Sequence, residues 1–294
     1  MNLGFIGTGN MGARFVPRLI AAGHTVSIFD NRLEAMTNLV LEGAIQSESA
    51  KQVASEADAV FVSLPNPAIV EKVALDENTG VIHALPKGSA FVDMSTSPPS
   101  LARKISERCN EIDVFGIDAP VSNGGIFVTI GGSKSIVDKL WPAFEAMCEK
   151  VIYMGPPGQG QIAKLCRQYV SYTAFFTLIE ALLIGHKSEV DTQKLANFIG
   201  ESTGNSGPGQ SLKRLAERDF GSPESARAKL DIVAKDLRMA VELAELIDSP
   251  HGTGTVTSDT LKAAQEEGWG EWEYWISACI LEEISGKKIE FPSL

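Results

Sequence analysis

Residues 4–12 read GFIGTGNMG, and this stretch decides the fold. It joins a short apolar run, NLGFIG, to a helix-like segment that extends from Asn10 to Ala22. Its glycines have the spacing G-x-G-x-x-G, which suits a tight turn, a close approach of the backbone to a pyrophosphate, and close packing of helix on strand. The stretch predicts a dinucleotide-binding turn with cofactor contacts from Gly7, Gly9, Asn10, Met11 and Gly12.

The next strand-like run, HTVSIFD, ends at Asp30, where an acidic side chain can hydrogen-bond both hydroxyls of an adenine ribose. A carboxylate there also repels a 2′-phosphate, so Asp30 predicts NAD as the cofactor. Asn31 and Arg32 follow directly, and an arginine at this place can instead contact a 2′-phosphate. NADP therefore stays an alternative, as does a simple turn-capping role for Asp30.

The rest of the first half of the chain alternates apolar runs with helix-like segments such as residues 98–109. This alternation is typical of βαβ units. We predict an α/β fold in which a Rossmann domain, with a doubly wound and mainly parallel sheet, spans residues 1–161. The strand-like runs are NLGFIG, HTVSIFD, DAVFVSL, SAFVDM, VFGIDA, IFVTIGG and VIYM.

After that boundary the pattern changes to helical periodicity. Between Leu230 and Ile247 apolar residues recur three or four positions apart, as one buried helix face requires, and the segment from Trp272 to Ile280 repeats this spacing. We predict an all-α domain over residues 162–294 that begins with a long interdomain helix. The tryptophans are expected in the core or at a subunit contact. Together with the long apolar helix they predict a homo-oligomer, a dimer or a tetramer.

Composition narrows the classes of partner. The formal net charge of −11 over 294 residues argues against nucleic acid or an anionic membrane, since both need a basic surface. The apolar stretch from Tyr169 to Gly185 contains Glu180 and is shorter than the roughly 20 residues that a bilayer requires, so we expect a buried helix.

The number and spacing of cysteines and histidines indicate in which kind of cellular compartment the protein is expected. Four cysteines, none in a CxxC pair, and four histidines indicate neither a disulfide framework nor a metal site. A reducing compartment fits best, and we expect a cytoplasmic location. The first apolar run begins at Asn2, so no secretory leader is expected in the sequence as given.

Several ordered motifs identify a family. GFIGTGNMG is followed by LPNP (64–67), VDMSTSPP (92–99), DAPVSNGG (118–125), GPPGQGQIAKLCRQ (155–168) and AKDLRMA (234–240). Together these resemble the β-hydroxyacid dehydrogenase family, whose members include 3-hydroxyisobutyrate dehydrogenases, tartronate semialdehyde reductases, and glyoxylate or succinic semialdehyde reductases. The likeness spans almost the whole chain.

The resemblance implies a role for each motif. Leu64, Pro65 and Lys235 would contact the cofactor, and Ser95 and Thr96 would contact its nicotinamide end, although a Ser-Thr-Ser-Pro-Pro run is also a good helix cap. A small anionic substrate would be held through its carboxylate by Ser122, Asn123 and Gly124, because hydroxyl and backbone donors suit that group. The glycines alone could equally form a plain turn.

Lys164 would be the general acid/base. Oxidation of an alcohol needs a proton acceptor within about 3 Å of the hydroxyl, and a half-buried ammonium beside a cationic nicotinamide should have a lowered pKa and can serve. Without the surrounding motifs, Lys164 would be taken for a solvated helix residue. The family places an asparagine one helical turn after this lysine, where the chain has Gln168, which predicts a reshaped substrate pocket.

A second departure follows DAPVSNGG, which runs straight into IFVTIGG without the GAxxGT-like stretch usual in relatives. We predict an NAD(P)-dependent oxidoreductase that interconverts a small β-hydroxy acid and its semialdehyde or keto acid. The alternative is a catalytically degenerate NAD(P)-binding sensor or partner protein. An imine reductase-like enzyme is a further alternative, against which Lys164 argues because imine reductases typically lack that lysine.

Overall fold

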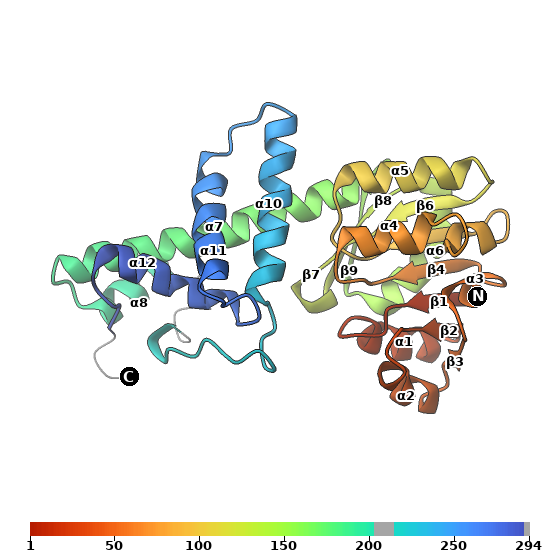
Figure 1. The fold of residues 1–294 in the computed structure, drawn as a ribbon, viewed down its shortest axis with the longest axis horizontal. Coiled ribbons are helices and arrows are strands. Elements are labelled where there is room, and N and C mark those ends of the chain that lie inside the picture. The colour runs from red at the N-terminus through yellow and green to blue at the C-terminus, as the bar shows by residue number, and fades with distance from the viewer. Residues whose placement is uncertain (203–214, 291–294) are drawn as a thin grey trace. The chain divides into compact units, whose positions relative to one another are not determined.

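The computed structural model describes residues 1–202 and 215–290 and divides the chain into two compact units, residues 1–164 and 165–294 (Figure 1). We call them the nucleotide unit and the helical unit. The helix α7 (Gln159–Lys187) begins in the first and continues through the second. The two units are described separately below.

The nucleotide unit is built on one sheet with the strand order β3-β2-β1-β4-β5-β6-β8-β7, in which β9 also pairs with β8. Pairing is parallel except between β6 and β8 and between β7 and β8. The order from β3 to β6 reverses beside β1, which is the doubly wound arrangement that the sequence predicts. The strands are β1 (Asn2–Ile6), β2 (Thr25–Phe29), β3 (Ile45–Gln46), β4 (Ala59–Val62), β5 (Ala90–Asp93), β6 (Phe115–Asp118), β7 (Val121–Ser122), β8 (Phe127–Gly131) and β9 (Lys150–Gly155).

Helices cover both faces of this sheet, and each face has its own apolar core. One core joins α1, α2 and α6 to the strands through side chains such as Phe15, Met36 and Phe144. The other joins α3, α4 and α5 to the opposite face, with Val70 and Ile105 among its members. The helices are α1 (Gly12–Ala21), α2 (Glu34–Leu41), α3 (Ala50–Ala54), α4 (Pro67–Leu75), α5 (Pro99–Asn110) and α6 (Lys134–Met147), and short 3-10 turns lie at η1 (Val81–Ala84) and η2 (Asn123–Gly125).

The helical unit packs around the middle of α7. α7 is long and apolar enough to span a membrane by length and mean hydropathy alone, a property that it shares with the core helices of globular domains. Phe175, Ile179 and Leu182 of α7 are buried with Leu237 of α10 in the core of this unit, as the sequence predicts for this stretch. The other helices are α8 (Thr192–Ser202), α10 (Leu230–Leu246), α11 (Gly252–Glu266), η4 (Tyr274–Ser277) and α12 (Ala278–Ser285).

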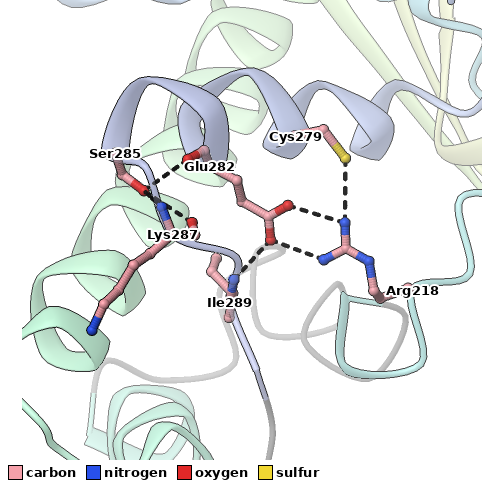
Figure 2. A network of polar contacts seen from close by, with 6 residues as sticks. All are labelled: Arg218, Cys279, Glu282, Ser285, Lys287 and Ile289. Carbon is pink, nitrogen blue, oxygen red and sulfur yellow. Dashed lines mark hydrogen bonds and ion pairs between the residues drawn. The ribbon is translucent and has the colours of Figure 1, made fainter.

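A polar cluster holds the segment around Ile289, which follows α12, against that helix (Figure 2). The buried carboxylate of Glu282 accepts hydrogen bonds from both terminal nitrogens of Arg218, at 2.9 and 3.0 Å, and from the amide of Ile289 at 2.9 Å. Arg218 also donates to the Cys279 sulfur at 3.5 Å. Glu282 therefore ties three separate segments of the helical unit together.

The seven predicted strands correspond to β1, β2, β4, β5, β6, β8 and β9. Two strands, β3 and β7, are two residues long, too short for the alternation that reveals a strand. The predicted helix from Trp272 is wrong at its start: a 3-10 turn precedes α12, which begins at Ala278. Trp272 and Trp275 nonetheless pack against the core of the helical unit, as predicted.

Candidate functional site

The glycine turn after β1 has the geometry that the motif predicts. Gly7 adopts φ +90°, and a β-carbon on it would lie 2.3 Å from the Ser63 carbonyl oxygen. A β-carbon on Gly12 would lie 2.5 Å from the Gly7 oxygen, so the helix packs onto the turn. On Gly9 the nearest atom among the described residues, apart from its chain neighbours, would be an Arg32 nitrogen at 3.6 Å. Gly7 and Gly12 therefore allow the backbone segments of the turn to pack closely together. The absence of a side chain at Gly9 leaves room for a ligand to approach the backbone.

The start of α1 suits an anion. Its N-cap residue, Met11, makes no side-chain capping bond, and Asn10 before it is exposed. The first amides of a helix point outward and carry partial positive charge, which attracts phosphate. Residues 7–12 therefore fit the pyrophosphate of a dinucleotide.

Asp30, at the end of β2, already holds the glycine turn. One oxygen accepts from the Thr8 amide at 2.8 Å and from the Thr8 hydroxyl at 3.3 Å, and the other accepts from the Arg32 amide at 2.9 Å. The Arg32 side chain is exposed, with its Nε 3.7 Å from the carboxylate, and Asn31 is exposed between them. Asp30 therefore stabilises the glycine turn and also stands where an aspartate that binds the ribose is expected.

The ends of β4 and β5 are joined by a hydrogen bond. The Leu64 amide donates to the Ser95 hydroxyl at 2.9 Å. Ser95 is buried, Thr96 is partly exposed and Pro65 is exposed. These residues therefore lie with the glycine turn at the carboxyl edge of the sheet, where doubly wound folds bind their ligands.

The segment from Ser122 to Gly125 forms a tight left-handed turn. Ser122 is buried, and the φ angles of Asn123, Gly124 and Gly125 are +51°, +64° and +88°. The chain enters β8 two residues later, at Phe127. Glycine adopts such angles without steric cost and asparagine tolerates them, which accounts for the Asn-Gly-Gly sequence.

This turn is seated on α1. The Arg14 guanidinium donates to the Gly124 carbonyl at 2.5 Å, and a β-carbon on Gly125 would lie 2.8 Å from the Phe15 ring. We call residues 122–125 with this support the seated turn. Arg14 and Phe15 belong to the first turn of the helix that begins at Gly12.

Lys164 lies on the second turn of α7 and is buried, with 6% of its surface exposed. Its ammonium donates to the Val121 carbonyl at 2.7 Å, directly before the seated turn. The helix reaches this place because it packs closely on the sheet: a β-carbon on Gly160 would lie 2.5 Å from the Thr129 carbonyl oxygen. The glycine-rich stretch thus brings the lysine to the predicted carboxylate-binding residues.

The start of α7 is held by Asp118, the last residue of β6. Its carboxylate accepts from the amides of Gly158 and Gln161 at 2.7 and 2.8 Å. Burial raises the pKa of Asp118 to about 6, against the opposing effect of these two hydrogen bonds, and the nearby Asp93 carboxylate contributes to the rise. Asp118 therefore positions the helix that carries Lys164.

The remaining predicted residues lie in the helical unit. Gln168 is buried one helical turn after Lys164, and its amide nitrogen donates to the Tyr172 hydroxyl at 2.6 Å and to the Asp236 carboxylate at 2.9 Å. The Lys235 ammonium lies 3.0 Å from the other Asp236 oxygen. Gln168 and Lys235 are thus linked through Asp236, and the amide nitrogen of Gln168 is engaged inside this unit.

Sequence reasoning missed Asp118, Gln161 and Arg14 as parts of this site. The first two stand inside quoted motifs, DAPVSNGG and GPPGQGQIAK, so the motifs were the available signal. Burial of a polar side chain cannot be read from one sequence, because most such residues lie at the surface. Arg14 gives no signal of its own, since its partner is a backbone carbonyl far along the chain.

Two family models match the chain. The model described as the NAD binding domain of 6-phosphogluconate dehydrogenase matches residues 2–155. The model described as NAD-binding of NADP-dependent 3-hydroxyisobutyrate dehydrogenase matches residues 158–275.

Individual proteins show the same likeness. A probable 3-hydroxyisobutyrate dehydrogenase-like protein of Arabidopsis thaliana is 37% identical over 74% of this chain and 67% of its own length. An uncharacterised oxidoreductase of Bacillus subtilis is 32% identical over 93% of this chain and 98% of its own length. The solved structure of Mycobacterium tuberculosis 3-hydroxyisobutyrate dehydrogenase with L-serine superposes with a TM-score of 0.82 at 26% identity, covering 95% of this chain and 98% of the other.

Proposed function

Because the chain belongs to the β-hydroxyacid dehydrogenase family, we propose that it interconverts a small β-hydroxy acid and its semialdehyde or keto acid with Lys164 as the proton-transfer group. The chain is an NAD(P)-dependent oxidoreductase with a Rossmann domain and a helical carboxy-terminal domain. The proposal adds the catalytic residue, the substrate and the preferred cofactor to that assignment.

The observation that carries the proposal is the placement of Lys164. Its buried ammonium donates to the Val121 carbonyl at 2.7 Å, next to the residues expected to hold the substrate carboxylate. A bound nicotinamide supplies the hydride acceptor in oxidation and the hydride donor in reduction. The chain must supply the proton transfer at the substrate oxygen, and Lys164 Nζ takes this proton in oxidation and returns it in reduction.

The seated turn fits the carboxylate of the substrate. Ser122 offers a hydroxyl, and the left-handed residues 123–125 present backbone amides in a tight turn. Such donors bind a carboxylate without a mobile cation, which suits a chain whose net charge is −11. We propose 3-hydroxyisobutyrate or a β-hydroxy acid of similar size, such as L-serine, as the substrate, in line with the names of the similar proteins.

The preferred cofactor is NAD in this proposal, and Asp30 supports it. Its carboxylate lies at the end of β2, beside the glycine turn, where a 2′-phosphate would be repelled. Asn10, Met11, Ser95 and Thr96 would complete the cofactor contacts in the nucleotide unit. We also propose a substrate contact from Gln168 and a cofactor contact from Lys235.

The test is the kinetics of Lys164→Ala. We expect kcat to fall roughly 10²- to 10⁴-fold, the usual effect of a positioned acid/base, while NADH still binds at the glycine turn. Lys164→Arg should restore little, because a guanidinium keeps its proton. In the wild type, kcat/KM for oxidation should decrease as the pH falls, since only neutral Lys164 accepts a proton.

A matched control is Lys187→Ala, which removes the other lysine of α7, an exposed residue bonded to the Ser285 carbonyl. It should turn over a panel of hydroxy acids like the wild type. Wild-type turnover by Lys164→Ala in an intact fold would refute the catalytic assignment.

We also propose a homo-oligomer. Exposed apolar side chains occur on several helices of the helical unit, among them Val170, Ile184, Leu246, Val256 and Ile284. Large apolar surface favours association between copies. Light scattering of the purified chain tests this, and a monomer at all concentrations would exclude it.

A cytoplasmic location completes the proposal. Its support is that Cys109, Cys148, Cys166 and Cys279 are free thiols, as expected in a reducing compartment. Localisation of a tagged chain in its host cell tests the assignment.

A further inference from the structure

Gln161 is completely buried on the first turn of α7, three residues before Lys164. Both ends of its amide are bonded to one short segment: the nitrogen donates to the Ser95 carbonyl at 2.9 Å, and the oxygen accepts from the Ser97 amide at 3.0 Å. Only a group with one donor and one acceptor in this order satisfies both partners. The side chain therefore pairs with the main chain of residues 95–97 as a neighbouring strand would.

The segment held in this way is the one expected to contact the nicotinamide. Asp93 fixes it from the other side, because its carboxylate accepts from the Ser95 amide at 2.9 Å and from the Ser97 hydroxyl at 2.8 Å. The Ser95 hydroxyl in turn accepts from the Leu64 amide. Residues 95–97 are thus fastened to the ends of two strands and to α7.

The main chain of Gln161 is fastened too. Its amide donates to Asp118 at 2.8 Å, so the same residue is anchored to β6 through its backbone and to residues 95–97 through its side chain. Residues three apart on a helix lie on one face, which places Lys164 on the face that carries this contact. The buried side-chain amide of Gln161 therefore connects α7, which carries Lys164, with residues 95–97, which are expected to contact the cofactor.

We propose that Gln161 is a positioning residue that fixes Lys164 relative to residues 95–97, so that proton transfer and hydride transfer share one geometry. This inference rests on the proposed function of Lys164. Catalytic steps at this range are sensitive to displacements of about 1 Å, because reacting atoms must be held near 3–3.5 Å. Both side-chain hydrogen bonds of Gln161 go to the main chain of residues 95–97, so it acts through the two segments it joins.

The sharpest variant is Gln161→Glu, which keeps the shape of the side chain. An ionised glutamate accepts from the Ser97 amide but cannot donate to the Ser95 carbonyl, and it adds charge near Asp93 and Asp118. A protonated glutamate has one donor and one acceptor and restores both bonds. The variant should therefore lose function when its carboxyl is ionised and regain it when the carboxyl is protonated.

The kinetic experiment follows the reductive direction, in which Lys164 donates the proton and low pH does not remove it. At about pH 8 we expect kcat of Gln161→Glu to be roughly 10- to 100-fold below wild type, with a smaller change in KM. The ratio to wild type should recover at least about tenfold by about pH 5.5, and taking the ratio removes the effect of groups whose titration the variant leaves unchanged. A loss that does not depend on pH would overturn the proposal.

The second readout needs no cofactor. Hydrogen exchange of the Ser97 amide in the free protein, divided by its intrinsic rate at the same pH, should accelerate in Gln161→Leu, which lacks both bonding groups, and should stay near wild type in Gln161→Glu at low pH, because its carboxyl still accepts from this amide. Unchanged Ser97 protection and wild-type kcat in Gln161→Leu would also overturn the proposal.

Gln159→Glu is the matched control, since it adds the same charge to the same helical turn at a partly exposed position. Its kcat ratio should show no recovery at low pH, and its Ser97 exchange should match wild type. If Lys164→Ala is fully active while the exchange results hold, the proposed function fails and the connection made by Gln161 is structural only.

Discussion

The carboxylate of Asp30 serves two partners. A carboxylate has about four acceptor positions, and the amide and hydroxyl of Thr8 and the amide of Arg32 already use three of them. In the proposed function, ribose hydroxyls would share this carboxylate with the glycine turn. Asp30 holds the turn in the structure, and in the proposed function the same carboxylate also selects the cofactor.

We predict that Asp30→Ala weakens NADH binding at least about tenfold and reduces the preference for NADH over NADPH, because it removes the ribose acceptor and the repulsion of a 2′-phosphate. Fluorescence titration with the two cofactors measures both effects. Asp30→Asn separates the roles, since its amide oxygen still accepts from Thr8 while the charge is lost. An unchanged NADH/NADPH ratio in both variants would contradict NAD selection by Asp30, and a loss confined to NADPH in Arg32→Ala would indicate NADP as the cofactor.

At the scale of an element, the start of α7 depends on Asp118. Its pKa is raised by burial from 3.8 to about 6, so between these values the folded chain binds more protons than the unfolded chain. The contribution of Asp118 to stability therefore decreases as the pH rises through this window. Asparagine at this position does not titrate.

We predict that Asp118→Asn gains stability relative to wild type, on the order of 3 kcal/mol, as the pH rises from about 4 to about 7. Denaturant unfolding of the protein across this range measures the difference. Asp113→Asn is the control, and its stability relative to wild type should change with pH in the opposite direction. The exposed Asp113 pairs with Lys87, which lowers the pKa of its carboxyl, so the wild type gains stability from this pair as the pH rises and the variant does not. A difference between Asp118→Asn and wild type that is constant with pH would contradict the prediction.

At the scale of the whole molecule, stability of the helical unit depends on Glu282. Removing one partner of a buried ion pair leaves the other partner and its hydrogen bonds unsatisfied, and partial exposure of Arg218 reduces this cost. We expect Glu282→Ala to destabilise the helical unit by about 2 kcal/mol. Glu283→Ala, an exposed neighbour on the same helix, should change it little.

Tryptophan fluorescence measures this effect, because Trp269, Trp272 and Trp275 lie in the helical unit and Trp141 in the nucleotide unit. The unfolding midpoint reported by fluorescence should fall in Glu282→Ala and stay in Glu283→Ala. Equal midpoints for the two variants would show that the Arg218 pair adds nothing.

Much of the molecule could be predicted from the sequence because its signals are local. The glycine turn, the alternating runs and the helix that carries Lys164 each depend on neighbours within a few residues. The two-residue strands β3 and β7 carry too few side chains to show a period. Asp118, Gln161 and Arg14 act on backbone groups far along the chain, and only the folded topology brings these groups together.

The support of the seated turn has a thermodynamic consequence. The helix that begins at Gly12 is the one proposed to bind the pyrophosphate with its first amides, and through Arg14 and Phe15 it holds the residues expected to bind the substrate carboxylate. Both sets of contacts lie on the first turn of this helix, so a ligand that shifts this turn at one site alters the other site, and linkage requires the effect to be mutual. If cofactor raises substrate affinity by some factor, substrate raises cofactor affinity by the same factor, which titrations in both orders would measure. The enzyme would then favour its empty and fully loaded states over those with a single ligand.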